Sequence, residues 1–151
     1  MSPHQARELV RRLRAAYVDP PMDEETIDVY TRMLGDLRYD DVDPVVDELI
    51  ATVMKLPTIS RIRRAVIEPT LSFPTTDEAW LAIQTRNKEV HELVTHAATL
   101  LGGTFNIRTS EDPELTRVRF AKVYDQLYRK AVDRALAEGL RAQRMQLPRA
   151  S

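Results

Sequence analysis

Residues 42–67 read VDPVVDELIATVMKLPTISRIRRAVI, two apolar stripes separated by Leu56-Pro57-Thr58. Within each stripe the apolar residues recur three or four positions apart, which is the spacing of an amphipathic helix. Proline cannot continue a hydrogen-bonded helical turn, and Thr58 is a suitable N-cap for a helix over Ile59–Ile67. This stretch therefore predicts two consecutive helices with a sharp break between them.

The first of these two helices has the wider apolar surface. Asp40 or Asp41 is expected to cap it, with Pro44 in the first turn, where a missing N–H costs least. We expect it to be the most buried helix of its half, because one neighbouring helix is too narrow to cover the stripe. The stripe consists of Val45, Val46, Leu49, Ile50, Val53 and Met54.

Two further helices precede this pair. Residues 3–17 have the spacing of an amphipathic helix, which Asp19-Pro20-Pro21 ends. A second helix is predicted from Asp23, with acidic residues in its first turn, and we expect it to continue past Gly35. Together with the helix that Glu68-Pro69 ends, these segments predict a four-helix domain over residues 1–68.

The uncharged, proline-containing stretch 69–76 is typical of a connector between domains. Thr75 and Glu78 have capping-box spacing, and one or two helices are predicted from there to residue 101. Residues 104–111 are expected to form a loop, with a short extended piece at 105–107. Asp112-Pro113 predicts the start of a long final helix that runs toward residue 145. The C-terminal helical region is therefore predicted over residues 77–147.

Composition supports an all-α fold. The 151 residues include only four glycines but nine prolines, and β-rich proteins of this size usually need more glycine in their turns. There are no cysteines, which excludes disulfides and thiolate metal sites, and no apolar run approaches the ~18 residues of a membrane span. We expect a protein of the bacterial host cytoplasm.

Charge is balanced in sum, at −1, but not along the chain. Residues 22–56 carry ten acidic and three basic side chains, whereas residues 113–151 carry four acidic and nine basic ones. The predicted second and third helices are therefore acidic and the last helix is basic. Such opposed charges favour attraction within one chain, between chains, or toward separate partners.

No pattern indicates catalytic chemistry. His91 and His96 are five residues apart, which places them about 140° apart around a helix and prevents them from sharing a metal ion. Glycine-rich phosphate loops and nucleophile elbows are absent from the sequence. We therefore predict no enzymatic activity, no metal and no cofactor.

Several segments have a familiar order and spacing. In the N-terminal half these are Glu25-Thr26-Ile27 to Tyr30, Leu34-x-x-Leu37, Tyr39 with the aliphatic helix over 42–53, and Leu56-Pro57-Thr58-Ile59-Ser60-Arg61-Ile62-Arg63. In the C-terminal half they are Pro74-Thr75-Thr76-Asp77-Glu78-Ala79-Trp80, Leu101-Gly102-Gly103 and Arg117-x-x-Phe120-x-x-x-Tyr124-x-x-Leu127. The N-terminal half resembles the all-helical domain of phage replicative-helicase loaders, and the C-terminal half is similar to the tails of related phage replication proteins.

The resemblance implies a non-enzymatic replication adaptor that binds a DnaB-type hexameric helicase, restrains it, and delivers it to an origin through an initiator protein. We expect the helicase contact on the basic last helix, because tyrosine and arginine often contribute most of an interface's binding energy. The candidate contact residues are Tyr128, Arg129, Lys130, Arg134, Arg141 and Arg144, with Tyr124 nearby.

Two alternatives stay open at this point. The helix after Thr58 follows a short break, like the recognition helix of a helix-turn-helix protein, and its Arg61, Arg63 and Arg64 would contact DNA phosphates. The acidic helix before it would repel phosphates, so we rank DNA as a secondary partner. The other alternative is a structural dimer that buries apolar surface between two copies. No membrane partner is predicted.

Overall fold

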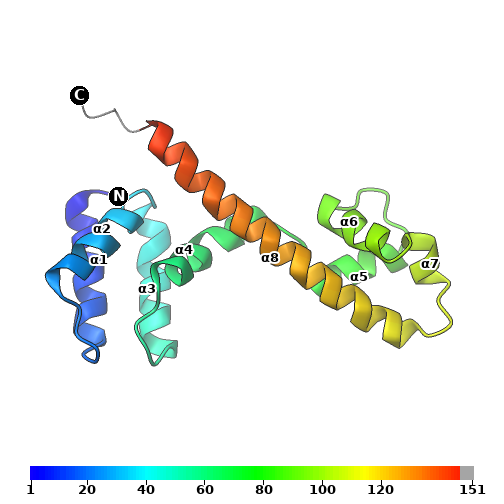
Figure 1. Cartoon of the computed structure of the whole chain (residues 1–151), viewed down its shortest axis with the longest axis horizontal. Helices are drawn as coiled ribbons and strands as arrows, with labels where there is room; N and C mark the ends of the chain where they lie inside the picture. Colours follow the sequence, from blue (N-terminus) through cyan, green and yellow to red (C-terminus); the bar gives the residue numbers. More distant parts are fainter. Residues whose placement is uncertain (147–151) are drawn as a thin grey trace. The chain divides into compact units, whose positions relative to one another are not determined.

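The computed structural model describes the backbone of residues 1–146 and the side chains of residues 1–142 (Figure 1). Over this range the chain is all-helical, which confirms the predicted fold class. It divides into two compact units. The first unit comprises residues 1–70 with the end of the last helix from Gly139, and the second unit comprises residues 71–138. None of the described helices has an apolar stretch long enough to cross a membrane.

The first unit contains four helices whose positions follow local sequence signals. They are α1 (Pro3–Ala16), α2 (Glu24–Leu34), α3 (Tyr39–Thr52) and α4 (Ile59–Ile67), and a 3₁₀ turn (Glu68–Leu71) follows α4. Asp23 accepts a hydrogen bond from the Thr26 N–H, which lowers the pKa of the Asp23 carboxyl group. Thr58 accepts one from the Arg61 N–H. These bonds confirm the predicted starts of α2 and α4.

Helix α1 is the central element of the first unit. Leu9, Val10 and Leu13 are fully buried and pack with apolar residues of the other three helices. We expected α3 to be the most buried helix, and this is wrong, because α3 has three buried residues whereas α1, which has the same length, has four. Met54, which we assigned to the stripe of α3, lies beyond the end of that helix and is 99% exposed.

The boundaries of α2 and α3 also differ from expectation. Helix α2 ends at Leu34, and the carbonyls of Gly35 and Leu37 beyond it accept hydrogen bonds from the ammonium group of Met1, at 3.1 and 2.7 Å. Helix α3 begins at Tyr39 without a side-chain cap, so the expected cap at Asp40 or Asp41 is wrong, because both residues lie inside its first turn. The backbone N–H groups of Asp41 and Val42 instead bond to the carbonyl of Arg38.

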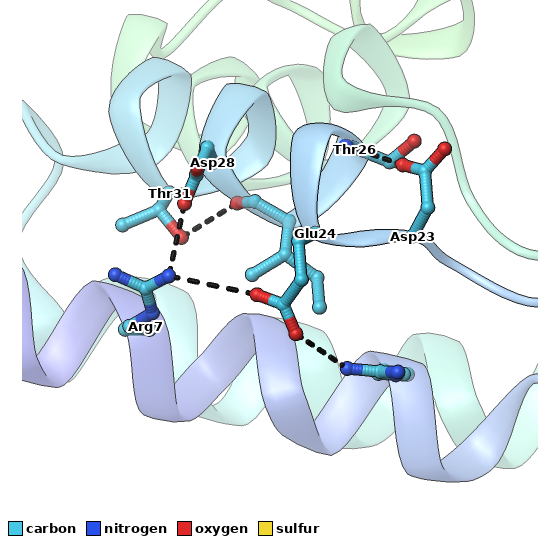
Figure 2. A network of polar contacts seen from close by, with 8 residues as sticks. Arg7, Asp23, Glu24, Thr26, Asp28 and Thr31 are labelled. Atoms are coloured by element: carbon cyan, nitrogen blue, oxygen red, sulfur yellow. Dashed lines mark hydrogen bonds and ion pairs between the residues drawn. The ribbon is translucent and has the colours of Figure 1, made fainter.

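The outer face of α1 is basic and is joined to α2 by ion pairs (Figure 2). The guanidinium of Arg7 lies 3.0 Å from a carboxylate oxygen of Asp28 and 3.7 Å from one of Glu24. Arg14 contacts the other oxygen of Glu24 at 3.1 Å. The cations of α1 therefore neutralise part of the acidic surface that the sequence places on α2.

The same arrangement joins α1 to α3. Arg12 bonds to Asp43 and lies 2.9 Å from Asp47, one turn further along α3. The hydrogen bond to Asp43 raises the pKa of the Arg12 guanidinium. The basic stripe of α1 thus pairs with carboxylates on two neighbouring helices.

A buried ion pair connects α4 to the turn after α2. Arg63 is 4% exposed, and its two terminal nitrogens lie 2.6 and 2.8 Å from the two carboxylate oxygens of Asp36. Arg63 also donates to the carbonyl of Met33 at 2.6 Å. The bidentate pair and the backbone acceptor satisfy the two terminal nitrogens, whereas the buried Nε of Arg63 has no hydrogen-bond partner among the described residues.

The second unit is formed by α5 (Thr76–Gln84), α6 (Glu92–Leu100), α7 (Thr104–Arg108) and α8 (Pro113–Gln146), the last of these up to residue 138. Thr75 caps α5 and Asp112 caps α8, both as predicted. The segment for which we left one or two helices open forms two. Arg86 has a φ of +53° in the break between them.

Helix α7 corrects the prediction of a loop with an extended piece at residues 104–111. Gly103, with a φ of +98°, allows the chain to turn into this helix. The N–H of Ile107 bonds to the Gly103 carbonyl, and the Ile107 side chain is 2% exposed. Tertiary burial therefore stabilises a helix that would be too short to form alone.

A row of aromatic rings lines the buried face of α8 in the second unit. Its ring centroids are 5.6 Å apart for Trp80 and Phe120, 5.7 Å for Phe120 and Tyr124, 6.3 Å for Tyr124 and Tyr128, and 5.8 Å for Tyr128 and Phe73. The Tyr124 hydroxyl donates to the Pro74 carbonyl at 2.5 Å, and burial raises the pKa of Tyr124 to about 12.

The predicted connector, residues 69–76, is thus partly packed. Phe73 and Pro74 contact residues of α8 within the second unit. The units divide after Thr70, and the end of α8 from Gly139 groups with the first unit. The division after Thr70 falls within the predicted connector.

Candidate functional site

The basic residues that we assigned to the helicase contact are mostly exposed. Arg129, Lys130 and Arg134 project from α8 in the second unit and are solvent-exposed. Among the residues whose side chains the structure describes, none forms an ion pair with any of these three. Their charges are therefore available to a partner.

The remaining candidates have different surroundings. Tyr128 is half-buried, and its ring packs edge-on against Phe73, so it supports the second unit rather than projecting as an exposed anchor. Arg141 is exposed in the part of α8 that groups with the first unit. The side chain of Arg144 lies outside the described residues.

A pocket of about 290 Å³ lies beside Arg134 in the second unit. Its floor is apolar and half-buried, and is formed by Phe73, Leu93, Ala131 and Ala135. Its rim is exposed and polar, and is formed by Glu92, His96, Arg134 and Glu138. An apolar centre with a polar rim is the usual composition of a protein-binding surface.

His91 lies at the edge of this pocket and has a structural task. It is the N-cap of α6, and its Nδ1 accepts a hydrogen bond from the Leu93 N–H at 3.1 Å. Its ring contacts Phe73 edge-on, with 5.4 Å between ring centroids. Because Nδ1 is an acceptor, the hydrogen of the neutral ring is on Nε2, which makes Nε2 a donor.

The expectation that His91 and His96 lie within one helix is wrong, because His91 is the N-cap and precedes the first turn of α6. His91 and His96 consequently line the same pocket. In the described part of the chain, no group of three or more histidine, cysteine, aspartate or glutamate side chains is positioned to hold a metal ion.

The three arginines of the DNA-binding alternative differ in how exposed their side chains are. Arg61 is exposed on α4, and Arg64 is half-buried and interacts within the chain. Arg63 is buried, and its terminal nitrogens bind Asp36 and Met33. Arg63 is therefore a structural residue, which corrects its assignment as a phosphate contact. A phosphate backbone would meet fewer cations on α4 than the sequence suggests.

The pocket was not predicted from the sequence. Its α8 side follows a detectable signal, since Ala131, Arg134, Ala135 and Glu138 share one helical face. Its other side depends on Phe73, which is far away in the sequence and was assigned to a connector.

Comparisons with protein-family models, curated proteins and solved structures give no match for this chain.

Proposed function

We propose that this chain is a non-enzymatic adaptor that binds an acidic surface of a partner protein through the exposed cations of α8. The partner that we propose is a DnaB-type replicative helicase, which the adaptor restrains and delivers to an origin. The choice of partner rests on the resemblance of the sequence segments to phage helicase loaders. The choice of surface rests on the geometry of the described side chains.

One observation carries the choice of surface. Arg7, Arg12 and Arg14 of α1 pair with carboxylates of α2 and α3, and Arg117 of α8 pairs with Asp77. By contrast, Arg129, Lys130 and Arg134 of α8 are exposed and have no ion-pair partner in the described part of the chain. Exposed charges accelerate encounter with a surface of opposite charge and help to select it. Helix α8 is therefore the stronger candidate for the interaction surface.

Surface cations also predict a salt dependence. Contacts between solvent-exposed charges weaken as the Debye length falls from about 10 Å at 0.1 M salt to about 3 Å at 1 M. A complex that relies on Arg129 and Arg134 should form at low salt and weaken at high salt. A complex held by apolar burial alone should persist.

The experiment is co-purification of the full chain with a hexameric DnaB-type helicase, followed by mass determination of the complex at two salt concentrations. The proposal predicts a complex of defined stoichiometry that the double variant Arg129→Glu, Arg134→Glu weakens. Arg119→Glu is the matched control, because Arg119 is exposed on the same helix but lies far from both residues. A chain that forms no complex with the helicase under either condition contradicts the proposal.

A further inference from the structure

The pocket beside Arg134 has features that go beyond a charged surface. Its floor residues, Phe73, Leu93, Ala131 and Ala135, belong to the stretch before α5, to α6 and to α8, all within the second unit. Three separate segments therefore form one apolar depression. A single exposed apolar residue would not form such a depression.

The volume limits what the pocket accepts. At about 290 Å³ it is just below the range of about 300–1,000 Å³ that is typical of small-molecule and cofactor sites. It has room for one large apolar side chain. Interfaces often gain most of their binding energy from such single anchors, which insert into a pocket that surrounding contacts shield from water.

The charges on the rim indicate which residue should flank that anchor. Arg134 is the one cation among the residues that line the pocket, and no described side chain forms an ion pair with it. The lining holds one arginine and two glutamates, so Arg134 is the group of the pocket that attracts a carboxylate. A planar guanidinium beside an apolar floor is suited to bidentate binding of a carboxylate.

Two carboxylates, Glu92 and Glu138, also lie on the rim. Glu92 lies in the first turn of α6, where the helix dipole already favours a negative charge. Glu138 lies one helical turn beyond Arg134 on α8.

We propose that this pocket binds a segment of the partner protein in which one large apolar side chain lies next to an acidic residue. The apolar side chain occupies the floor of Phe73, Leu93, Ala131 and Ala135. The neighbouring carboxylate bonds to the guanidinium of Arg134. This inference rests on the proposed function, because it identifies the side chains of the partner that α8 recognises.

The test uses short peptides as probes and therefore does not depend on the helicase. Acetyl-Phe-Asp-amide is titrated into the full chain labelled with ¹⁵N, and the amide shifts are followed by two-dimensional NMR. We expect saturable shifts confined to residues 91–96 and 131–138. Acetyl-Phe-Asn-amide and acetyl-Phe-Lys-amide should bind about three- to tenfold more weakly, because they lack the carboxylate.

Two variants connect the probe to the pocket. Ala135→Phe fills the floor and should abolish the shifts, whereas Arg134→Ala should remove the preference for aspartate over asparagine and leave the weak apolar binding. Far-UV circular dichroism establishes that both variants are folded. If Ala135→Phe does not fold, Arg134→Ala alone decides the proposal. Shifts that are scattered over the chain, or equal for all three peptides, overturn it.

Binding of the same variants to the helicase is the second part of the test. If Ala135→Phe, which keeps the cations of α8, binds the helicase as well as the wild-type chain does, the proposed function stands and the pocket inference fails. If the peptides bind as expected but the helicase does not, the pocket is an acidic-peptide site and the helicase is the wrong partner. The two proposals can therefore fail separately.

Discussion

Helices α1 and α8 have similar basic stripes in sequence but different surroundings in the structure. On α1, Arg7, Arg12 and Arg14 contact carboxylates of α2 and α3. On α8, Arg129 and Arg134 are exposed. A run of arginines therefore does not by itself indicate a binding surface. What matters is whether the helices packed beside it supply carboxylates.

The largest expected effect concerns an arginine that the sequence alone suggested as a DNA contact. Arg63→Ala should lower the free energy of unfolding by about 3–5 kcal/mol, because it leaves the carboxylate of Asp36 without its buried partner. Urea denaturation of the full chain measures this. Arg61→Ala on the same helix is the control and should change stability by less than about 0.5 kcal/mol, because Arg61 is exposed. Equal effects would mean that Arg63 is not structural.

A smaller effect is expected on α1. Arg12→Glu removes contacts with Asp43 and Asp47 and places three carboxylates together, which should cost about 1–2 kcal/mol in this half-exposed position. The cost should shrink in 1 M salt. Arg11→Glu is the matched control, since Arg11 is exposed on the adjacent position of α1. If both variants are equally stable, the pairing of α1 with α3 contributes nothing.

In the second unit, Tyr124→Phe should cost about 1 kcal/mol at neutral pH, because the hydroxyl no longer donates to the Pro74 carbonyl. Folding raises the pKa of Tyr124 to about 12, so the folded state favours the neutral hydroxyl. Its contribution is complete below about pH 10, the ordinary value for tyrosine, and is lost as the pH rises through about 12. The wild-type chain should therefore lose stability more steeply over this interval than Tyr124→Phe, as followed by the fluorescence of Trp80. Parallel curves would contradict the assignment.

The smallest effect on stability is expected on the exposed face of α8. Arg129→Glu and Arg134→Glu should each change the free energy of unfolding by less than about 0.5 kcal/mol. Thermal unfolding followed by circular dichroism measures this. A large loss of stability in either variant would show that these cations are held within the fold, as those of α1 are.

The sequence predicted best what depends on neighbouring residues. The caps at Asp23, Thr58, Thr75 and Asp112 are local signals, and the structure confirms the helix starts that they predict. An all-α fold follows from such signals together with helical periodicity.

The incorrect predictions concern features that depend on contacts between residues far apart in the sequence. Helix α2 ends before Gly35, where the Met1 ammonium binds the carbonyls of Gly35 and Leu37, and α7 forms because Ile107 is buried in the second unit. Tyr128 was predicted to be an exposed anchor, but its ring packs against Phe73. Helical periodicity relates residues three or four positions apart, so it predicts none of these contacts.

The same limit applies to the candidate site. Arg129, Lys130 and Arg134 were predicted from charge, and the structure places them on the surface. The pocket beside Arg134 needs Phe73 and α6 as well as α8, so periodicity within one helix indicates only half of it.

The most direct test is the affinity of a DnaB-type helicase for three forms of the full chain, measured at low salt. The account predicts that the double variant Arg129→Glu, Arg134→Glu binds at least about tenfold more weakly than the wild-type chain, a difference of about 1.4 kcal/mol, whereas Arg119→Glu binds as the wild-type chain does. Equal affinity for all three forms would contradict the assignment of α8 as the binding surface.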